Sequence, residues 1–376
     1  MTNTSYFATT AKGLEEVLSR ELVNLGLKVE EVTTGGVAFS GSRRDAYRAC
    51  LWLRTANRIL QPIGKFPCRS ADMLYTRVRE LPWKDYLSPE MTIAVDAKLR
   101  NSQLSHSKYV ALKTKDAIVD TMRDRTGQRP NVDPGSPDLR INVHLANDRC
   151  TLSLDLTGDG LHRRGYRQDL TVAPLRETLA AGLIGLSGWQ GDTSFVDPMC
   201  GSGTLPLEAC LLASRRAPGL FGRSYGFERW QDIDRALWQE VKEEAREQAL
   251  QTAPVAIWGA DKDGRALKTA RNNAARADLK EMIHWQHTEF ANLQPPEMPG
   301  TLLLNPPYGE RLGDCLALEP LYRSIGDTLK QRWTGWTAWV LTGNLQLAKK
   351  VGLKASRRLV LYNGPIECRL LKYELY

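Results

Sequence analysis

The sequence predicts an α/β fold in which a doubly wound, mostly parallel sheet follows two smaller α+β units. From residue 193 onward, strand-like and helical segments alternate, as they do when helices cross between parallel strands. Before residue 158 the order is irregular and includes a hairpin of alternating strands at 138–158. A charged, glycine-bearing stretch at 159–169 separates the two patterns and is the predicted boundary of the last domain, 159–376.

The first unit is predicted over residues 1–60. A short strand at 5–10 precedes a helix at 11–26, whose apolar residues recur at helical spacing. Two strands joined by a Gly-Gly turn follow at 28–41, and a second amphipathic helix is predicted over 44–60. These elements predict a small α+β domain.

The second unit is predicted over residues 61–158. It combines a strand at 91–99, a helix at 107–127 and the hairpin at 138–158. The helix carries several cations that are candidate RNA contacts, although periodicity alone favours an ordinary packing unit with a solvated helix face. These candidates are Lys108, Lys113 and Lys115, with Arg163 and Arg164 in the boundary stretch.

Composition and charge set the class of protein. Of 376 residues, 42% are hydrophobic and 25% charged, as in soluble globular proteins, and the apolar runs are shorter than a membrane span. No secretory signal is visible at the start, and the seven cysteines are scattered without a Cys-x-x-Cys pair. We therefore expect a cytoplasmic protein with reduced thiols, and the five dispersed histidines predict no metal site.

The net charge of +8 is concentrated in the first half of the chain. Residues 1–165 hold 25 Lys and Arg against 19 Asp and Glu, a net of +6, whereas residues 166–376 hold 26 against 24, a net of +2. A basic bias of this size suits a polyanionic partner such as RNA, and it also suits solubility alone.

A glycine loop at 195–204 follows a predicted strand and opens a helix. Gly201 and Gly203 would let the backbone approach a ligand closely. A dinucleotide site would place a third glycine where Pro206 stands, and no Gly-Lys-Ser/Thr phosphate loop is present. Asp197, at the strand end, would repel phosphate and suit a ligand that carries an amino group.

The next predicted strand also ends in an acid, Asp261, which is placed to accept hydrogen bonds from ribose hydroxyls. It stands 58 residues after Gly203, where roughly 20 is usual, because an apparent insertion of a loop and a helix occupies 214–253. A nucleoside without phosphates that carries an amino-acid tail and a positive charge is S-adenosylmethionine. The loop and the two acids together predict that cofactor.

The stretch LLLNPPYGERL, residues 302–312, ends a third predicted strand. Two consecutive prolines cannot continue a strand, so the chain turns at the edge where open α/β sheets bind ligands. The Asn305 side-chain oxygen and the Pro306 carbonyl could accept the hydrogens of an exocyclic amine, and Pro307 completes the rigid turn. Tyr308 would offer a flat face to a base.

Taken in order, these motifs resemble a known family. DPMCGSGTLPLEA, GADKD, LLNPPYGERL and the linker LHRRGYR with APLRETLAAGLI resemble the ribosomal RNA guanine-N2 methyltransferases that carry a THUMP domain. The resemblance implies a ferredoxin-like domain at 1–60, a THUMP RNA-binding domain at 61–158 and a Rossmann-like class I methyltransferase domain at 159–376. It implies methyl transfer from S-adenosylmethionine to the N2 amine of a guanine, most simply in 23S ribosomal RNA. The sequence leaves the oligomeric state open, with a monomer favoured.

The resemblance also assigns roles to residues at matching positions. The catalytic turn would be Asn305, Pro306, Pro307 and Tyr308. Contacts to the cofactor would come from Tyr166, Arg176, Asp197, Pro198, Cys200, Gly201, Ser202, Gly203, Thr204, Asp261, Glu289, Phe290 and Asn305. Glu289 and Phe290 would contact the adenine, and Tyr166, Arg167 and Arg176 would border the methionine carboxylate.

Several other functions remain open. The asparagine-proline-proline-tyrosine motif also occurs in adenine-N6 methyltransferases, and transfer RNA is an alternative substrate. An RNA-binding assembly factor with an idle catalytic domain is a second class, against which the intact Asp197, Asp261 and Asn305 speak. Cysteine-based C5 methylation would need a nucleophilic cysteine after the prolines, where Tyr308 stands, and an NAD enzyme would need the third glycine.

Overall fold

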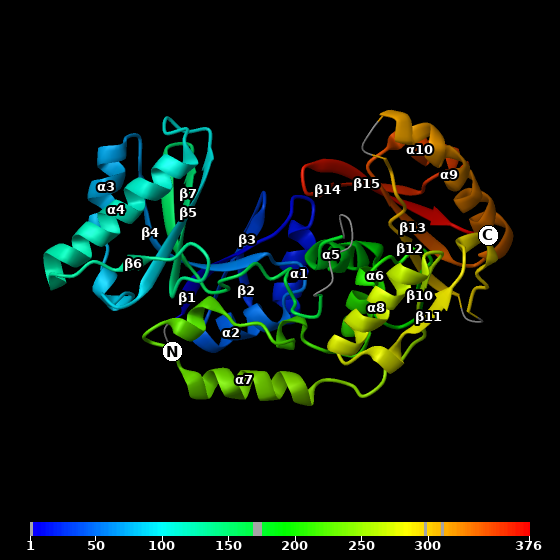
Figure 1. Ribbon diagram of the computed structural model, residues 1–376, viewed down its shortest axis with the longest axis horizontal. Helices are drawn as coiled ribbons and strands as arrows, with labels where there is room; N and C mark the ends of the chain where they lie inside the picture. Colours follow the sequence, from blue (N-terminus) through cyan, green and yellow to red (C-terminus); the bar gives the residue numbers. More distant parts are fainter. Residues whose placement is uncertain (1–2, 168–174, 297–298, 310–311) are drawn as a thin grey trace.

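The computed structural model of the protein describes residues 3–167, 175–296, 299–309 and 312–376, and for 312–315 it describes the backbone alone. Two sheets organise these residues, and they lie towards opposite ends of an elongated molecule (Figure 1). The first sheet has eight strands in the order β2-β3-β1-β4-β8-β7-β5-β6. Its strands are β1 (Thr4–Thr9), β2 (Lys28–Thr33), β3 (Gly36–Gly41), β4 (Arg58–Pro67), β5 (Thr92–Arg100), β6 (Asn131–Val132), β7 (Leu139–Ala146) and β8 (Arg149–Asp155).

This sheet is continuous through the two units predicted before residue 158. Strand β4 pairs with β1 on one side, Leu60 opposite Phe7, and with β8 on the other, Lys65 opposite Thr151. It therefore crosses the predicted boundary at residue 60, and the two units share one hydrogen-bonded ladder.

The predicted helix over 44–60 is too long. Helix α2 runs from Arg43 to Trp52, and β4 begins only six residues later, at Arg58. The helix ends there because Glu21 accepts the backbone N–H groups of Arg54 and Thr55, a contact between distant residues that helical periodicity cannot reveal.

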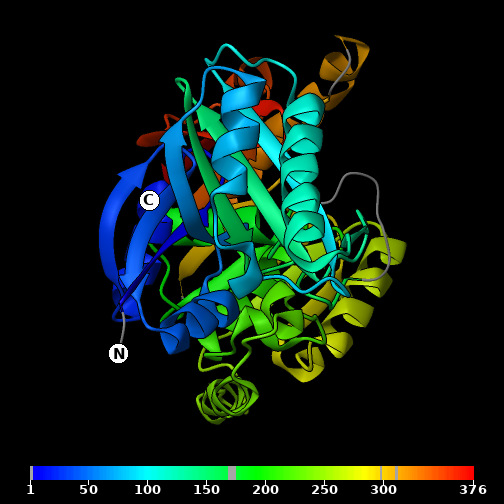
Figure 2. The ribbon, with the colours of Figure 1, turned by 90° about the vertical axis from the view of Figure 1, so that its left-hand side faces the viewer.

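Helices cover the N-terminal sheet in two groups. The apolar residues of α1 and α2 form one buried core with β1, β3 and a later helix, α7, from the predicted insertion. A second core lies under α3 and α4, which Figures 1 and 2 show on the outer side of the sheet, away from the C-terminal domain. These helices are α1 (Glu15–Asn24), α2 (Arg43–Trp52), α3 (Ala71–Arg79), α4 (Ser107–Thr126) and α7 (Arg235–Glu247), with a short helical turn η1 (Trp83–Asp85) after α3.

The predicted insertion at 214–253 thus belongs in space to the first unit. Trp238 of α7 packs edge-on against Tyr47 of α2, and Arg44 pairs with Glu240 and Glu244. The helix of the insertion, α7, therefore packs on the N-terminal domain. The distance of 58 residues between Gly203 and Asp261 therefore does not separate the two residues in space.

The second sheet confirms the predicted doubly wound α/β fold. Its seven strands follow the order β11-β10-β9-β12-β13-β15-β14, in which β15 runs antiparallel to both of its neighbours, β13 and β14, and the other pairs are parallel. Its strands are β9 (Ser194–Asp197), β10 (Ile257–Asp261), β11 (His284–His287), β12 (Gly300–Leu304), β13 (Thr337–Thr342), β14 (Arg357–Asn363) and β15 (Ile366–Glu374). The remaining elements are α5 (Glu177–Ser187), α6 (Thr204–Ala213), α8 (Gly264–Arg276), α9 (Leu312–Arg332), α10 (Leu345–Lys350), η2 (Pro218–Leu220), η3 (Gly226–Arg229), η4 (Lys280–Met282) and η5 (Phe290–Asn292).

Helices lie on both faces of this sheet because successive strand residues point to opposite sides. In β12, Leu303 packs into the core under α5, α6 and α8, whereas Leu302 and Leu304 pack into the core under α9 and α10. Because both faces of the sheet are buried, the central strands have continuous apolar sequences. Among the described residues, no helix combines the length and apolar character needed to cross a membrane.

Candidate active site

Three strand ends meet at one edge of the C-terminal sheet. Strand β9 lies between β10 and β12, and all three are parallel, so Asp197, Asp261 and Asn305 leave the sheet on the same side. In the register, Asp197 lies opposite Gly259, two residues before Asp261. The carboxyl edge of such a sheet is where ligands bind in open α/β folds.

The glycine loop is tied to this edge by its own backbone. Gly201 donates its N–H to an Asp261 side-chain oxygen at 2.8 Å, and the Cys200 N–H donates to the Ala260 carbonyl at 2.9 Å. Gly201 and Gly203 have φ angles of +54° and +84°, a region that disfavours residues with a Cβ atom. The loop thus presents backbone to the edge in a shape that only glycine adopts easily.

Gly203→Ala is expected to destabilise the protein more than Gly201→Ala. Both changes place a Cβ in the left-handed region, at about 1–2 kcal/mol. At Gly203 the new atom would also lie 2.9 Å from Ala270 Cβ and from the Trp285 ring, whereas Gly201 has open space around it. Urea unfolding of the two variants measures the difference, and equal losses would contradict the steric explanation.

Asp197 is a buried acid, and only 1% of its surface is exposed. One of its oxygens accepts the Met199 N–H at 3.1 Å, which leaves hydrogen-bonding capacity on the carboxylate. Burial, opposed by that hydrogen bond and reinforced by the charge of Asp261, raises the pKa of Asp197 well above its usual value. A cation placed beside the carboxylate would restore its ionised form.

Asp261 is held by two backbone groups. Besides Gly201, its other carboxylate oxygen accepts the Asp263 N–H at 2.9 Å, and its carbonyl accepts the Thr288 N–H at 3.1 Å. Each carboxylate oxygen can accept a further bond, so the predicted contact with ribose stays a prediction. Thr288 brings the segment of Glu289 to this edge.

The asparagine turn follows β12 as predicted. Asn305 is half-buried, and its side-chain oxygen is buried and accepts no hydrogen bond from any described residue. Such an atom loses about 1–3 kcal/mol relative to water unless it gains a partner, so the Asn305 oxygen is a candidate acceptor for a ligand group. Pro306 is buried, Pro307 is exposed, and neither can donate a backbone N–H.

Tyr308 is half-buried and anchored at both ends. Its hydroxyl accepts a hydrogen bond from the Asn363 side chain at 2.9 Å, and its carbonyl is 3.5 Å from the Asn344 side-chain nitrogen. The ring lies close to Gly343, where an added Cβ would be 3.0 Å away. Its orientation is therefore fixed by β14 and by the loop after β13.

Several predicted cofactor contacts turn out to support the loop from inside. Cys200, Ser202 and Thr204 are at most 7% exposed, and Pro198 is buried. The Asn273 side chain donates to the Ser202 carbonyl at 3.1 Å. Burial, followed by the charges of Asp197 and Asp261, raises the pKa of the Cys200 thiol, which disfavours the nucleophilic thiolate.

The adenine-contact prediction divides between its two residues. Glu289 is exposed at the start of η5. The ring of Phe290 is 7% exposed and packs 5.8 Å from the Trp333 ring, inside the core. Its ring fills the apolar space under α9, and the contact with adenine stays a prediction for both residues.

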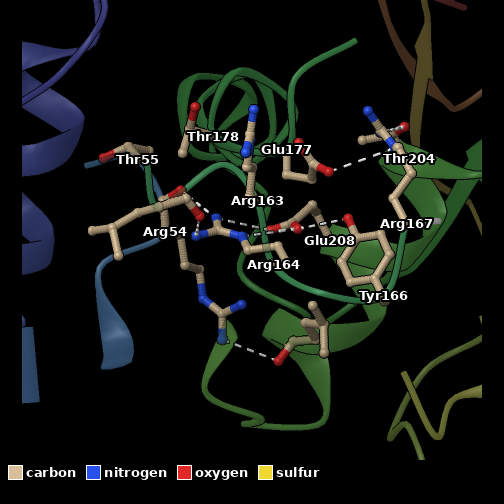
Figure 3. Close-up of polar contacts among 12 residues, drawn as sticks. Arg54, Thr55, Arg163, Arg164, Tyr166, Arg167, Glu177, Thr178, Thr204 and Glu208 are labelled. Carbon is tan, nitrogen blue, oxygen red and sulfur yellow. Dashed lines mark hydrogen bonds and ion pairs between the residues drawn. The ribbon is translucent and has the colours of Figure 1, made fainter. Parts of the chain in front are cut away.

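The linker before α5 is buried, contrary to its charged sequence. The Arg164 guanidinium is 2% exposed and lies 3.4 Å from both carboxylate oxygens of Glu208 on α6 (Figure 3). It also donates to the Arg54 carbonyl at 2.5 Å, and the Tyr166 hydroxyl donates to Glu208 at 3.0 Å. This cluster of Arg164, Tyr166 and Glu208 joins the N-terminal domain to the helix that follows the glycine loop.

Two predictions are therefore corrected. Arg164 cannot contact RNA, because its donors are committed to buried acceptors. Tyr166 is not at the cofactor surface, because its ring lies in the apolar core and its hydroxyl is bonded to Glu208. Arg163, by contrast, has 69% of its side chain exposed beside Asp159, and Arg176 is exposed at the start of α5.

Glu208 belongs to the site but was not among its predicted members, whereas Arg167 was predicted to border the methionine carboxylate. Arg167 donates to the Thr204 hydroxyl at 2.5 Å and lies 3.5 Å from Glu177, so it holds the first residue of α6 (Figure 3). The one signal for Glu208 is an acid inside the otherwise apolar helix TLPLEACLLA.

Glu208→Ala is expected to destabilise the protein by about 3–5 kcal/mol, because it leaves the Arg164 charge buried without a partner. The double variant Arg164→Met/Glu208→Leu should recover most of the loss, since it removes both charges at similar volume. Urea unfolding of the variants provides the measurement. A loss below about 1 kcal/mol in Glu208→Ala would show that the pair is solvated.

The predicted RNA contacts on α4 are mostly engaged. Lys113 lies over the Tyr75 ring at 4.8 Å, and Lys115 pairs with its neighbour Asp116. Lys108 is exposed near the start of the helix. Among the described residues, no group of histidine, cysteine and acidic side chains could hold a metal ion.

A doubly wound sheet that gathers a glycine loop, two acids and an Asn-Pro-Pro-Tyr turn at its carboxyl edge defines a methyltransferase-type domain. Comparison with family models agrees, as the model described as RMKL-like, methyltransferase domain, matches residues 164–372. The chain belongs to this RMKL-like methyltransferase family. Models of the THUMP domain and of the RlmL ferredoxin-like domain match residues 68–155 and 5–60.

Individual relatives extend the comparison over the whole chain. A putative RNA methyltransferase of Synechocystis sp. is 44% identical over 375 residues, which cover 100% of this chain and 98% of that protein. The ribosomal RNA large subunit methyltransferase K/L of Syntrophotalea carbinolica is 45% identical over 381 residues, 98% of this chain and 53% of that protein. The chain spans about half the length of the K/L relatives it matches.

Solved structures show the same architecture. A putative methyltransferase crystallised with SAH is 34% identical, with a TM-score of 0.89, and the match covers 100% of this chain and 99% of that chain. A predicted N6-adenine-specific DNA methylase from Listeria monocytogenes is also 34% identical, with a TM-score of 0.90 and coverage of 100% and 97%.

Proposed function

We propose that the protein transfers a methyl group from S-adenosylmethionine to the N2 amine of a guanine in large-subunit ribosomal RNA, in the cytoplasm. The observation that carries this proposal is the buried, unpartnered Asn305 oxygen at the same sheet edge as Asp197 and Asp261. The names of the K/L relatives support the ribosomal substrate, and the THUMP match at 68–155 supports RNA.

The residues at the edge fit the cofactor. Asp197 would hold the amino group, because a buried carboxylate needs a cation to remain ionised. Asp261 would accept from the ribose hydroxyls with its remaining lone pairs, and the loop at Gly201 and Gly203 would face the amino-acid tail. When bound, S-adenosylmethionine supplies an electrophilic methyl group on a sulfonium sulfur.

The asparagine turn would prepare the base for attack. An exocyclic amine is a weak nucleophile, since its lone pair is delocalised into the ring. The Asn305 oxygen and the Pro306 carbonyl would accept its two hydrogens and favour a pyramidal nitrogen with a localised lone pair. After attack the nitrogen is positively charged and acidic, so it loses a proton to water and no strong base is required.

Tyr308 would position the base. Its ring is fixed by the bond from Asn363 and can stack on the flat face of a base drawn out of its helix. The rigid diprolyl turn holds the acceptors and the stacking face in one arrangement, which aligns the amine without reorganisation during the reaction.

The test uses purified protein, labelled S-adenosylmethionine, and unmodified ribosomal and transfer RNA in parallel. The RNA is digested and the methylated nucleoside is identified by mass spectrometry. N2-methylguanosine from ribosomal RNA is the expected product. N6-methyladenosine would keep the role of Asn305 and overturn the base, product in transfer RNA alone would overturn the substrate, and failure to bind the cofactor would favour an RNA-binding assembly factor.

A further inference from the structure

The two faces of the second half of the N-terminal sheet differ in what covers them. In β7, Ile141, Val143 and Leu145 point into the core under α3 and α4. The residues between them, including His144, point to the other face. Figures 1 and 2 show this other face turned away from α3 and α4, towards the rest of the molecule.

One end of this face is covered and the other is open. At the covered end, Asp155 is 1% exposed, and the Phe227 N–H of the η3 segment donates to the carbonyl of the next residue, Leu156. Arg229 closes the same end by donating to the carbonyls of Ser136 and Pro137. Towards the turn between β7 and β8, the side chains on this face are exposed.

The open end carries four cations on three strands, which we call the basic face. They are Lys65 on β4, Lys98 and Arg100 on β5, and Arg149 on β8.

The register places these cations in two adjacent rows. Lys98 lies opposite His144, which lies opposite Thr151, which lies opposite Lys65. The next row joins Arg100 to Arg149 through Ala146. With strands about 4.8 Å apart, the first row is about 14 Å wide, a span that several consecutive phosphates of a nucleic acid would occupy.

The cations of the basic face have no anionic partners within the described part of the chain. The carboxylates on the same side are engaged elsewhere, Asp96 with Arg140 at 2.8 Å and Asp155 with Arg58. On the outer helix α4, Lys115 pairs with Asp116 and Arg123 with Asp120 and Asp124, whereas Lys108 and Arg125 are exposed. The helix thus mixes carboxylates with its cations, whereas the open sheet face carries four cations that form no ion pair with any described residue.

The pKa of His144, which lies in the first row, is shifted in this environment. Desolvation, followed by the charges of Lys98 and Arg100, lowers the pKa of His144. Four exposed cations that repel one another form a surface that an extended polyanion would stabilise.

We propose that the basic face, rather than helix α4, binds the phosphate backbone of the RNA substrate. Because the surface is positively charged, its ligand is expected to be a polyanion. The proposal rests on the RNA methyltransferase function proposed above. Cations contact phosphates through charge alone, so contacts here would position the RNA without reading its sequence.

The experiment compares Lys98→Ala/Arg100→Ala/Arg149→Ala with a control that removes three cations from α4, Lys115→Ala/Arg123→Ala/Arg125→Ala. Filter binding of each protein to an unmethylated large-subunit ribosomal RNA transcript, without cofactor, is measured across salt concentrations. Loss of three phosphate contacts should reduce the slope of log affinity against log salt by about 2–3 and weaken binding at least about tenfold near physiological salt. The control should keep a slope close to that of the wild type.

An unchanged slope in the sheet variant, or an equal reduction in the α4 control, would overturn the proposal. Cofactor binding and melting temperature, which should match the wild type in both variants, exclude misfolding. This experiment distinguishes a failure of the basic-face proposal from a failure of the proposed function. RNA binding that depends on the basic face without formation of N2-methylguanosine would refute the function alone, whereas product formation with an unchanged slope would refute the basic face alone.

Discussion

Asn305→Ala is expected to abolish methyl transfer while cofactor binding survives. The substitution removes the buried oxygen that would hold the amine at the end of β12, and it leaves Asp197 and Asp261 in place. Loss of a single preorganised group that stabilises a transition state costs about 10²–10³ in kcat, and the amine here is unreactive without it. Transfer of labelled methyl to RNA measures turnover, and calorimetry with S-adenosylmethionine measures binding.

Two further variants make this expectation specific. Asn305→Asp keeps an acceptor oxygen at the same place, so it should retain more activity than the alanine variant. Asn292→Ala removes an exposed asparagine from the neighbouring η5 turn and should leave turnover unchanged. Normal turnover in Asn305→Ala would refute the mechanism, and an aspartate variant as inactive as alanine would refute the acceptor role.

Asp197→Asn is expected to abolish cofactor binding and, at the same time, to stabilise the protein without ligand. The neutral amide cannot balance the cofactor's amino group, and loss of one partner of a buried charge pair costs about 2–5 kcal/mol, roughly 30- to several-thousand-fold in affinity. Calorimetry with S-adenosylmethionine measures the first effect, and thermal melting measures the second.

The pH dependence of both effects follows from the raised pKa of Asp197. The folded protein holds this proton more tightly than the unfolded chain does, so the wild type loses stability as the pH rises from the unfolded pKa towards the folded pKa. Above the folded pKa of Asp197, the melting temperature of Asp197→Asn should therefore be higher than that of the wild type. Below the unfolded pKa, the two melting temperatures should be equal. Wild-type cofactor affinity should fall as the pH drops through the folded pKa, with proton release on binding.

Asp192→Asn is the matched control, because Asp192 is exposed two residues before β9 and loses the same charge. It should change neither cofactor affinity nor the pH dependence of melting. If Asp197→Asn binds the cofactor as the wild type does, Asp197 does not contact the amino group. If it melts lower than the wild type above the window, the carboxylate is stabilised by contacts other than those seen here.

Much of the C-terminal fold was predictable because its strands are buried on both faces and its helices alternate with them. Strand β4 was missed for the opposite reason. Its sequence contains Pro62, Gly64 and Pro67, which normally argue against a strand. The ladder tolerates them through an irregularity between Pro62 and Gly64, and pairing on both sides holds the strand in place.

The candidate site was predictable where function depends on position in the chain and not where it depends on packing. Asp197, Asp261 and Asn305 directly follow or end strands, so parallel pairing alone brings them to one edge. The burial of Arg164 depends on Glu208, 44 residues away, and on the Arg54 carbonyl of another domain. A charged linker sequence is more often exposed, and the sequence carries no sign of the tertiary partners that decide otherwise.

The shared strand β4 has a consequence for how the protein selects its target. A bend between the first two domains would break the hydrogen bonds of β4 to β1 or β8, so these domains move as one rigid body. The cluster of Arg164, Tyr166 and Glu208 fastens that body to α6, beside the glycine loop. Both features resist changes in the span from the basic face to Asn305. An RNA gripped at the basic face would offer for methylation only a nucleotide at one fixed reach, so the enzyme would choose its guanine by length along the folded RNA as well as by the chemistry of the base.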